Sequence, residues 1–476
     1  MEDWNGPVWN AGSYLLPGNT YTYSAWVYHE ENSSVSFRLV MTVNQFGGSG
    51  GDWNQLITKN VPRSTWTELK ADYTVKTGEF FFRPSLSTWP STCEFYADDI
   101  KIVLKSGTIP SSDIQTSLMS VKDAPKFIQK DLLIGIGAGN TVFQDTTGNR
   151  QALLVKHFNS FAIENSFKPV YILDYPASKA NMGVHNERVA LDFTLVIPYY
   201  DFALKNNMKM SAQALLWFML TPDWFFRVNY DPSQPLAGRD LMLKRMENFI
   251  KDVMTWSQTN YPGMVKMWVV CNESFDPNDS VNTGTTNPYR VRNDNWYKTV
   301  GVDYVAKAFE FAQKYKTDSD LDLVYNDYNM ESNATKLGYV LSYIQAYDLQ
   351  LDGIGYQLHT QLSSPAISTI KANLELSKND NRVKGRNLVV YISEMDVQAN
   401  NNSTATQNTL GNRYRDLIDT FLTADIRLKG ISWWCLNDGY TWLTSNNSQQ
   451  MFPLLFDINN QAKPAYYGVM QAAGGL

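Results

Sequence analysis

Two glutamates stand at the ends of apolar runs, where their carboxyl groups could do acid–base chemistry. Glu273 closes "MVKMWVVCNE" (264–273), and Glu394 closes "NLVVYISE" (387–394). When two carboxyl groups face each other across a cleft, one can protonate a leaving oxygen while the other attacks the anomeric carbon or activates water. The pair therefore indicates hydrolysis of a glycosidic bond.

Polar neighbours of these glutamates could keep one carboxylate ionised and oriented. Asn272 directly precedes Glu273, and His359 lies in "YQLHT" (356–360); both side chains can donate hydrogen bonds. A single glutamate at a strand end is more often solvated or ion-paired, and a single histidine more often packs in a core. The combination, rather than any one residue, favours a catalytic site.

Strand-like runs alternate with helix-like segments from about Asp123 onward and predict an α/β fold, a (β/α)8 TIM barrel. The eight runs are 131–139, 168–173, 208–217, 265–273, 321–329, 351–360, 387–397 and 428–438. Residues 238–257 repeat apolar side chains at helical spacing. By this count Glu273 and Glu394 end strands four and seven, at the catalytic rim of such a barrel. An open doubly wound sheet is the alternative, but "GIGAG" (135–139) makes a weak phosphate-binding motif.

The first part of the chain has strand-like runs without helix-like segments between them. Residues 1–106 predict an all-β jelly roll or β-sandwich, with strand-like runs at 19–29, 34–43, 66–75, 79–87 and 93–104. Residues 107–122 are predicted to form a linker, and residues 123–476 the barrel. A chain of 476 residues is long enough for two such domains.

Composition excludes several classes of protein. The net charge of −6, with no basic run, argues against a nucleic-acid partner. No stretch approaches the ~20 apolar residues of a membrane span. Three well-separated cysteines argue against a disulfide framework, and the four histidines lack metal-ligand spacing, so we expect no metal and no organic cofactor. The opening Met-Glu-Asp-Trp is not a signal peptide, which suggests a processed or artificial start.

Several motifs resemble those of the family-10 glycoside hydrolases, the endo-β-1,4-xylanases. "WVVCNESFDPN" (268–278) is similar to their acid/base motif Trp-Asp-Val-Val-Asn-Glu-Ala, and "YISEMDV" (391–397) to their nucleophile motif Ile-Thr-Glu-Leu-Asp. Further similar runs, in the family's order, are 157–169, 220–226, 291–309, 325–329, 352–359, 433–442 and 454–466. The resemblance covers about residues 123–476 and implies a retaining endo-β-1,4-xylanase.

The resemblance also implies roles for single residues. Glu273 is the expected general acid/base and Glu394 the expected nucleophile. Asn272 is expected to contact the sugar 2-OH, and His359 to partner the nucleophile. The other expected substrate-binding residues are Glu164, Asn165, Lys168, Gln213, Trp217, Gln357, Trp434 and Trp442.

The sequence departs from the family pattern on strand three, where "SAQALLWF" (211–218) replaces Arg-Gly-His-Thr-Leu-Val-Trp-His. Gln213 and Phe218 stand where the family has histidines, and Val269 where the acid/base motif has aspartate. Gln213 can donate and accept hydrogen bonds but cannot become cationic. Two alternatives therefore stay open: a non-hydrolysing or weakly active xylan-binding barrel, and a related retaining hydrolase acting on β-glucan or decorated xylan.

The N-terminal segment has a resemblance of its own. "CEFYADDIKIVLK" (93–105) resembles the last strands of carbohydrate-binding modules of the family 4 and 22 type. The opening strands of such modules are missing, which predicts an incomplete sandwich. The tryptophans expected near loops, where one or two could stack on sugars, are Trp4, Trp9, Trp53 and Trp89. Those expected to pack in a core are Trp26, Trp66 and Trp296.

These inferences together predict the partner and the location. The expected partner is xylan or a xylo-oligosaccharide, with no nucleic acid and no membrane span. Because a polysaccharide does not enter cells, an extracellular or cell-surface location is expected. The sequence makes no prediction of oligomeric state.

Overall fold

The computed structural model describes residues 15, 18–43, 52–76, 79, 82–90, 93–107, 114–145, 147–278, 287–447 and 449–476. Trp4 and Trp9 lie outside the described residues. The chain divides into two compact units. The smaller consists of Met1–Asp113, Asn437–Phe452 and Asp457–Gln461, and the larger of Ile114–Leu436, Pro453–Phe456 and Ala462–Leu476.

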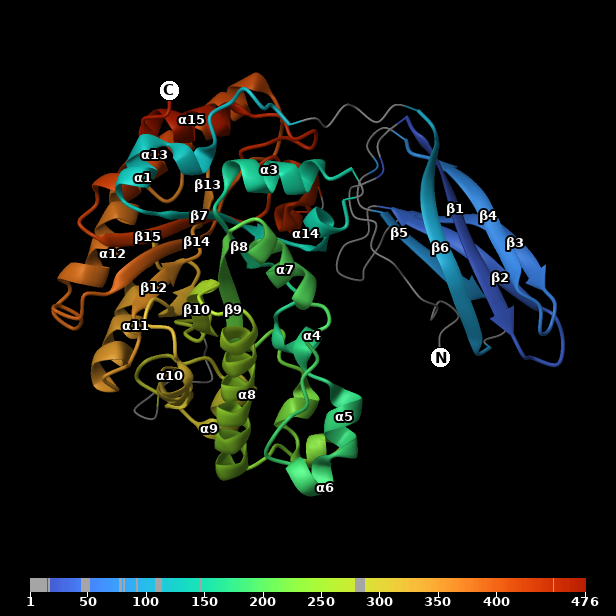
Figure 1. The fold of residues 1–476 in the computed structure, drawn as a ribbon, viewed down its shortest axis with the longest axis horizontal. Helices are drawn as coiled ribbons and strands as arrows, with labels where there is room; N and C mark the ends of the chain where they lie inside the picture. The colour runs from blue at the N-terminus through green and yellow to red at the C-terminus, as the bar shows by residue number, and fades with distance from the viewer. Residues whose placement is uncertain are drawn as a thin grey trace. The chain divides into compact units, whose positions relative to one another are not determined.

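The larger unit is built on a closed barrel of eight parallel strands, which confirms the predicted fold class (Figure 1). In hydrogen-bonded order the strands are β7 (Leu133–Ala138), β8 (Ser160–Ile163), β9 (Lys209–Trp217), β10 (Val265–Asn272), β11 (Asp322–Asp327), β12 (Gly353–Tyr356), β14 (Val389–Gln398) and β15 (Arg427–Trp433). Pairing of β12 with β14 and of β15 with β7 closes the barrel. A short strand, β13 (His359–Gln361), pairs with β14.

Barrel strands are buried on both faces, because the lumen lies on one side and helices on the other. In β10 every residue is buried except Lys266, and in β14 every residue except Gln398. Such strands read as continuous apolar runs. The polar residues at their C-terminal ends are the first that can face the rim.

Helices surround the barrel, and α8 confirms the helix predicted at 238–257, since its apolar stripe is buried. The helices of the larger unit are α1 (Pro125–Gln129), α2 (Asn140–Phe143), α3 (Asn149–His157), α4 (Pro169–Ile172), α5 (Tyr175–Ala180), α6 (Met182–His185), α7 (Ile197–Lys205), α8 (Arg239–Asn260), α9 (Asn295–Val300), α10 (Tyr304–Tyr315), α11 (Ala334–Ala346), α12 (Ile367–Asn379), α13 (Thr404–Thr423) and α15 (Pro464–Ala473), with 3-10 turns η1 (Val121–Asp123), η2 (Asp223–Phe226) and η3 (Val228–Tyr230). The smaller unit contains α14 (Trp442–Asn447) and η4 (Asp438–Tyr440).

The strand predicted at 168–173 is wrong, because that segment contains helix α4. Pro169 is the first residue of α4, where its missing N–H costs no hydrogen bond and its fixed φ suits a helix. The second barrel strand is instead β8, which has only four residues. Four residues are too few to show a strand pattern, so the longer apolar run "KPVYIL" (168–173) gives the stronger strand signal.

The smaller unit contains two three-stranded antiparallel sheets, which confirms the predicted sandwich class. One sheet has the order β4-β1-β6 and the other β3-β2-β5. The strands are β1 (Thr20–His29), β2 (Val35–Val43), β3 (Asp52–Val61), β4 (Thr67–Thr74), β5 (Phe82–Thr88) and β6 (Phe95–Ser106). The strand β3 is not among the predicted strands, because it is an edge strand whose side chains are mostly exposed and show no apolar alternation.

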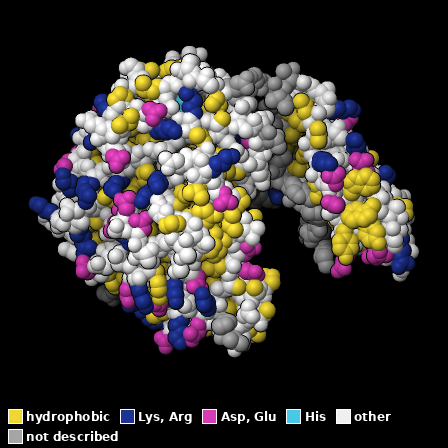
Figure 2. Space-filling view, in the orientation of Figure 1, with side chains coloured by type: hydrophobic (Ala, Val, Ile, Leu, Met, Phe, Trp, Pro, Cys, Tyr) yellow, Lys and Arg dark blue, Asp and Glu magenta, His cyan; other side chains and the backbone are white. Residues whose placement is uncertain are grey.

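Two of the tryptophan predictions for this unit are wrong. Trp26 and Trp66 are 37% and 46% exposed rather than packed in a core. Trp26 lies on the outer face of the sheet β4-β1-β6, between the buried Ala25 and Val27. Hydrophobic side chains gather on this face (Figure 2). Trp296, in the larger unit, is buried as predicted.

Three further findings concern the described residues only. None of their helices is long and apolar enough to cross a membrane. They contain no group of three or more His, Cys, Asp or Glu that could hold a metal ion. The three cysteines, all of them described, form no disulfide bond.

Candidate active site

One rim of the barrel collects most of the predicted site residues, because each stands where a parallel strand ends. Glu164 follows β8, Trp217 ends β9, Asn272 ends β10, Gln357 follows β12, and Glu394 lies in the second half of β14. Glu273 is the first residue after β10. The two glutamates therefore belong to the fourth and seventh strands of one closed sheet.

The carboxyl group of Glu273 is held by three donors from different strands. Its Oε1 accepts hydrogen bonds from Asn272 Nδ2 at 3.0 Å and from Gln357 Nε2 at 2.9 Å. Its Oε2 accepts one from Trp217 Nε1 at 3.0 Å. With the residue only 9% exposed, this cage fixes the direction in which the carboxyl group points.

A buried amide, Asn326 on β11, links the two glutamates. Its Nδ2 donates to Glu394 Oε1 at 2.8 Å and to Asn272 Oδ1 at 2.9 Å, and its Oδ1 accepts from Ser393 Oγ at 2.6 Å. Room for this amide depends on Gly355 of β12, because a Cβ there would lie 2.4 Å from Asn326 Oδ1. The bridge places Glu394 two hydrogen bonds away from Asn272, a direct partner of Glu273.

His359 connects Glu394 to a second carboxylate. Its Nε2 lies 3.5 Å from Glu394 Oε2 and its Nδ1 lies 3.0 Å from Asp396 Oδ2. Burial by itself would lower the pKa of His359, but the charge and hydrogen bond of Asp396, together with those of Glu394, raise this pKa to about 10. The imidazole is therefore cationic near neutral pH.

Glu273 experiences a different environment. Burial raises the pKa of its carboxyl group, and the negative charges of Asp327 and Glu394 raise it further, against the opposing hydrogen bonds from Gln357 and Trp217. A carboxyl group whose pKa is raised in this way keeps its proton at higher pH than an ordinary glutamate does. The raised pKa suits Glu273 to donate a proton.

A half-buried lysine, Lys168, interacts electrostatically with both glutamates. Burial lowers the pKa of Lys168, while the charges of Glu394, Glu164 and Glu273 oppose that shift. Its Nζ lies 4.5 Å from the centre of the Trp217 ring and 3.2 Å from Asn165 Oδ1. A lysine between three carboxylates and an aromatic ring provides donors for sugar hydroxyl groups.

Three predicted residues of the larger unit, Asn165, Gln213 and Trp434, have no described contact with these glutamates. Gln213 is buried on β9, and its Oε1 has no hydrogen-bond partner among the described residues. Trp434 is buried after β15 so close to Gly137 that a Cβ there would lie 2.6 Å from its ring. Trp442 lies in α14, within the smaller unit. The departure at Val269 is a packing change, because this residue belongs to a small apolar cluster of barrel-strand residues.

Four residues of the site are not among those predicted from the sequence. Asn326 and Asp327 end β11, Asp396 follows Glu394 by two positions, and Arg292 donates a hydrogen bond from Nε to the backbone oxygen of Glu273 at 3.1 Å. A usable signal exists for the first two: the polar pair closes an apolar run. The role of Arg292 has no local signal, because a loop brings it back to the glutamate.

Comparisons with known proteins identify relatives of both parts of the chain. Residues 124–472 match the family model Glycosyl hydrolase family 10, and residues 1–89 match a model described as Carbohydrate binding domain. Endo-1,4-beta-xylanase B of Butyrivibrio fibrisolvens is 34% identical over 71% of this chain and 51% of its own length. Exoglucanase XynX of Acetivibrio thermocellus is 29% identical over 98% of this chain and 41% of its own length.

A solved structure resembles the whole chain. It contains the CBM22-1–GH10 modules of endo-1,4-beta-D-xylanase 10B of Clostridium thermocellum, complexed with xylohexaose. Its TM-score is 0.63 at 26% sequence identity, and the match covers 98% of this chain and 88% of that one. This chain spans about half or less of the length of the two curated relatives named above.

Proposed function

This chain belongs to glycosyl hydrolase family 10, and from that premise we propose that it hydrolyses xylan as a retaining endo-β-1,4-xylanase. The observation that carries the proposal is the Asn326 bridge. Asn326 donates hydrogen bonds to Glu394 and to Asn272, which is itself a hydrogen-bond partner of Glu273. One buried hydrogen-bond network therefore connects two carboxyl groups that lie in different electrostatic environments.

In the first step, the Glu394 carboxylate attacks the anomeric carbon of the sugar. The bond from that carbon to the glycosidic oxygen breaks as Glu273 gives the oxygen its proton. Asn326 and the His359 cation hold Glu394, and the raised pKa of Glu273 keeps the transferable proton in place. The product is a glycosyl ester of Glu394 and a shortened chain that departs.

In the second step, water replaces that chain. The Glu273 carboxylate takes a proton from water, the water oxygen bonds to the anomeric carbon, and Glu394 leaves as a carboxylate. Two inversions at one carbon retain its configuration. Asn272, which precedes Glu273 and lies against it, is proposed to bind the sugar 2-OH.

The proposal is tested by assaying linear xylan, arabinoxylan and mixed-linkage glucan for reducing ends, with the first-formed anomer followed by proton NMR. We expect β-configured products from xylan, and a loss of at least about 10³-fold in kcat for Glu394→Ala. Thermal melting of the variant provides the folding control. An α-configured first product, or persistent activity of the variant, would contradict the assignment.

One observation favours a second candidate, a retaining hydrolase of β-glucan. A relative that aligns with 98% of this chain is named an exoglucanase, and Gln213 stands on β9 where the family pattern has a histidine. Sugar release from glucan alone would select this candidate. Release from none of the three polymers would instead favour a barrel that binds xylan without turnover.

We also propose that the smaller unit binds xylan through the outer face of the sheet β3-β2-β5. The support is the match to a carbohydrate binding domain and an exposed pair of rings, since Trp53 and Trp89 are 53% and 45% exposed. The Arg38 guanidinium lies 5.4 Å and 4.8 Å from the centres of these rings. Flat apolar faces beside hydrogen-bond donors suit stacking on sugars.

The proposed substrate also suggests where the protein acts. Because xylan is too large to enter cells, we propose an extracellular or cell-surface location. Immunodetection in the medium, the envelope and the cytosol of the producing cells tests this, and a purely cytosolic signal would contradict it.

A further inference from the structure

We propose that Arg292 is a positioning residue for proton transfer: it fixes the backbone turn at Glu273 and so aims the carboxyl group at the leaving oxygen. The inference rests on the proposed function, in which Glu273 protonates that oxygen. Arg292 comes from the loop that precedes α9, and it does not itself need to touch the sugar.

The backbone of Glu273 needs such support. Its φ is +57°, in the left-handed region that residues with a Cβ occupy only when their surroundings hold them there. Its N–H donates to the backbone oxygen of Asn326 at 2.9 Å. Its carbonyl oxygen accepts from Arg292 Nε at 3.1 Å. Both backbone groups of the strained residue are therefore bound from outside its own segment.

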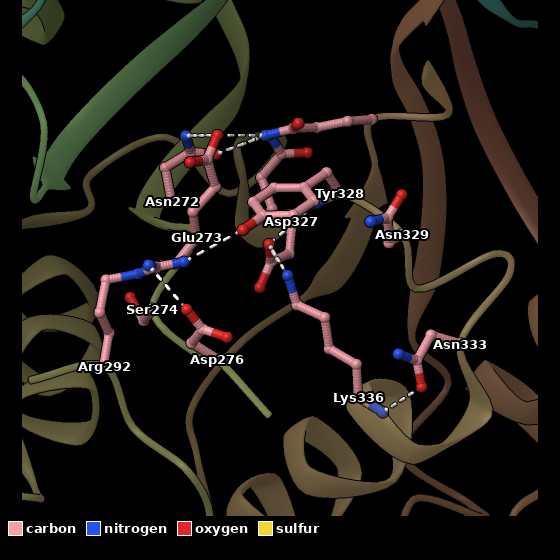
Figure 3. Close-up of polar contacts among 12 residues, drawn as sticks. Asn272, Glu273, Ser274, Asp276, Arg292, Asp327, Tyr328, Asn329, Asn333 and Lys336 are labelled. Carbon is pink, nitrogen blue, oxygen red and sulfur yellow. Dashed lines mark hydrogen bonds and ion pairs between the residues drawn. The ribbon is translucent and has the colours of Figure 1, made fainter. Parts of the chain in front are cut away.

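The Arg292 side chain is held on several sides (Figure 3). One terminal nitrogen donates to Asp276 Oδ2 at 3.0 Å and the other to the Tyr328 hydroxyl at 3.2 Å. The centre of the guanidinium lies 4.2 Å from the centre of the Phe218 ring. Phe218 stands where the family pattern has a histidine. A phenyl ring attracts the guanidinium, whereas a protonated imidazole would repel it.

The residue after Glu273 is held by a separate set of contacts. The Ser274 N–H donates to the Tyr325 hydroxyl at 3.1 Å, and that hydroxyl donates to Asp327 Oδ2 at 2.5 Å. Asp327 is paired with the buried Lys336 of α11 at 2.6 Å, and the ammonium lies 3.6 Å from the centre of the Tyr328 ring. Tyr328 thus contacts both cations, so the two sets of contacts form one connected clamp (Figure 3).

The test uses leaving groups of different acidity. Glycosylation of the enzyme by 2,4-dinitrophenyl β-xylobioside needs no proton donor, because the phenolate leaves unaided, whereas xylohexaose needs one. For Arg292→Met we expect kcat/KM on xylohexaose to fall on the order of 10- to 100-fold, and kcat/KM on the aryl xylobioside to fall less than about threefold. Turnover (kcat) of the aryl substrate also falls, because the second step needs the same glutamate as base.

Two control variants, Glu273→Ala and Arg382→Met, show whether the loss is specific to proton transfer. Glu273→Ala should show the same selectivity with a larger loss. Arg382→Met removes a matched arginine that likewise binds a carbonyl oxygen, a hydroxyl and a carboxylate, those of Gly338, Ser342 and Asp380; any loss it causes should be equal on both substrates. Phe218→Ala removes none of the hydrogen-bond partners of Arg292. It should reproduce the selectivity more weakly, and it replaces Arg292→Met if that variant proves unstable by thermal melting.

Equal losses on both substrates for the Arg292 and Phe218 variants, with Glu273→Ala still selective, would overturn the positioning role alone. A wild-type protein that cleaves neither substrate would overturn the proposed function, and this inference with it.

Discussion

Glu273 and Glu394 differ most in the charges around them. Glu394 lies beside a histidine cation and an amide donor. Burial raises the pKa of Glu273, and the negative charge of Asp327 raises it further. In the proposed mechanism, the different roles of these two chemically identical side chains therefore come from their neighbours. Those neighbours are the residues whose replacement should change the pH dependence.

Replacing Asp327 should shift the pH profile of hydrolysis. In the proposed mechanism Glu273 acts while protonated, so kcat/KM should fall as pH rises through its pKa, which lies above the ordinary 4.5. Asp327→Asn removes a charge that raises this pKa, so the alkaline limb of the kcat/KM profile should move to lower pH. Asp322→Asn, at the other end of β11, is the control and should leave that limb in place. An unchanged limb in Asp327→Asn would show that Asp327 does not set the acidity of Glu273.

At the scale of strands, the site depends on close approach between β11 and β12. Gly355→Ala would put a Cβ 2.4 Å from the Asn326 amide oxygen, and the amide would have to leave its bridge. We expect kcat on xylan to fall at least about tenfold, since an electrostatic partner of the nucleophile is displaced. Gly183→Ala, where no atom lies within 4 Å of the added Cβ, provides the matched control. Activity equal to wild type in Gly355→Ala would mean that the bridge is dispensable.

Sequence patterns predict two kinds of feature: apolar strands that recur along the chain, and polar residues that end an apolar strand. Seven barrel strands and the carboxylates closing two of them stand out because apolar runs stop at polar residues. The strand β8 was missed because it has four residues. The bridging role of Asn326 was missed because it depends on register with β12 and on Gly355, which no local pattern encodes. The predictions for Trp26, in β1, and Trp66, directly before β4, are wrong because an aromatic residue in or beside a strand does not reveal which face of the sheet it occupies.

At the scale of the whole molecule, two units carry separate proposed sugar surfaces. Tethering a binding face to a catalytic barrel raises the local concentration of polymer without changing the chemistry. A change on the binding face should therefore alter the action on insoluble xylan and leave short soluble substrates unaffected.

Trp53→Ala in the full chain should weaken binding to insoluble xylan by about 0.5–1.5 kcal/mol, or roughly 2- to 12-fold in Kd. The value of kcat/KM on xylohexaose should not change. Trp26→Ala is the matched control, because this exposed tryptophan lies on the other sheet. Depletion assays with insoluble xylan measure the difference. Equal weakening by both substitutions would remove the outer face of β3-β2-β5 as the binding surface.

The described partners of the two glutamates are confined to the ends where barrel strands finish, and this has a practical consequence. The ends where the strands begin hold no residue with an assigned chemical role, so they are available for engineering. Substitutions there could raise heat tolerance while leaving substrate choice unaltered, and a designer could optimise durability and selectivity in independent libraries.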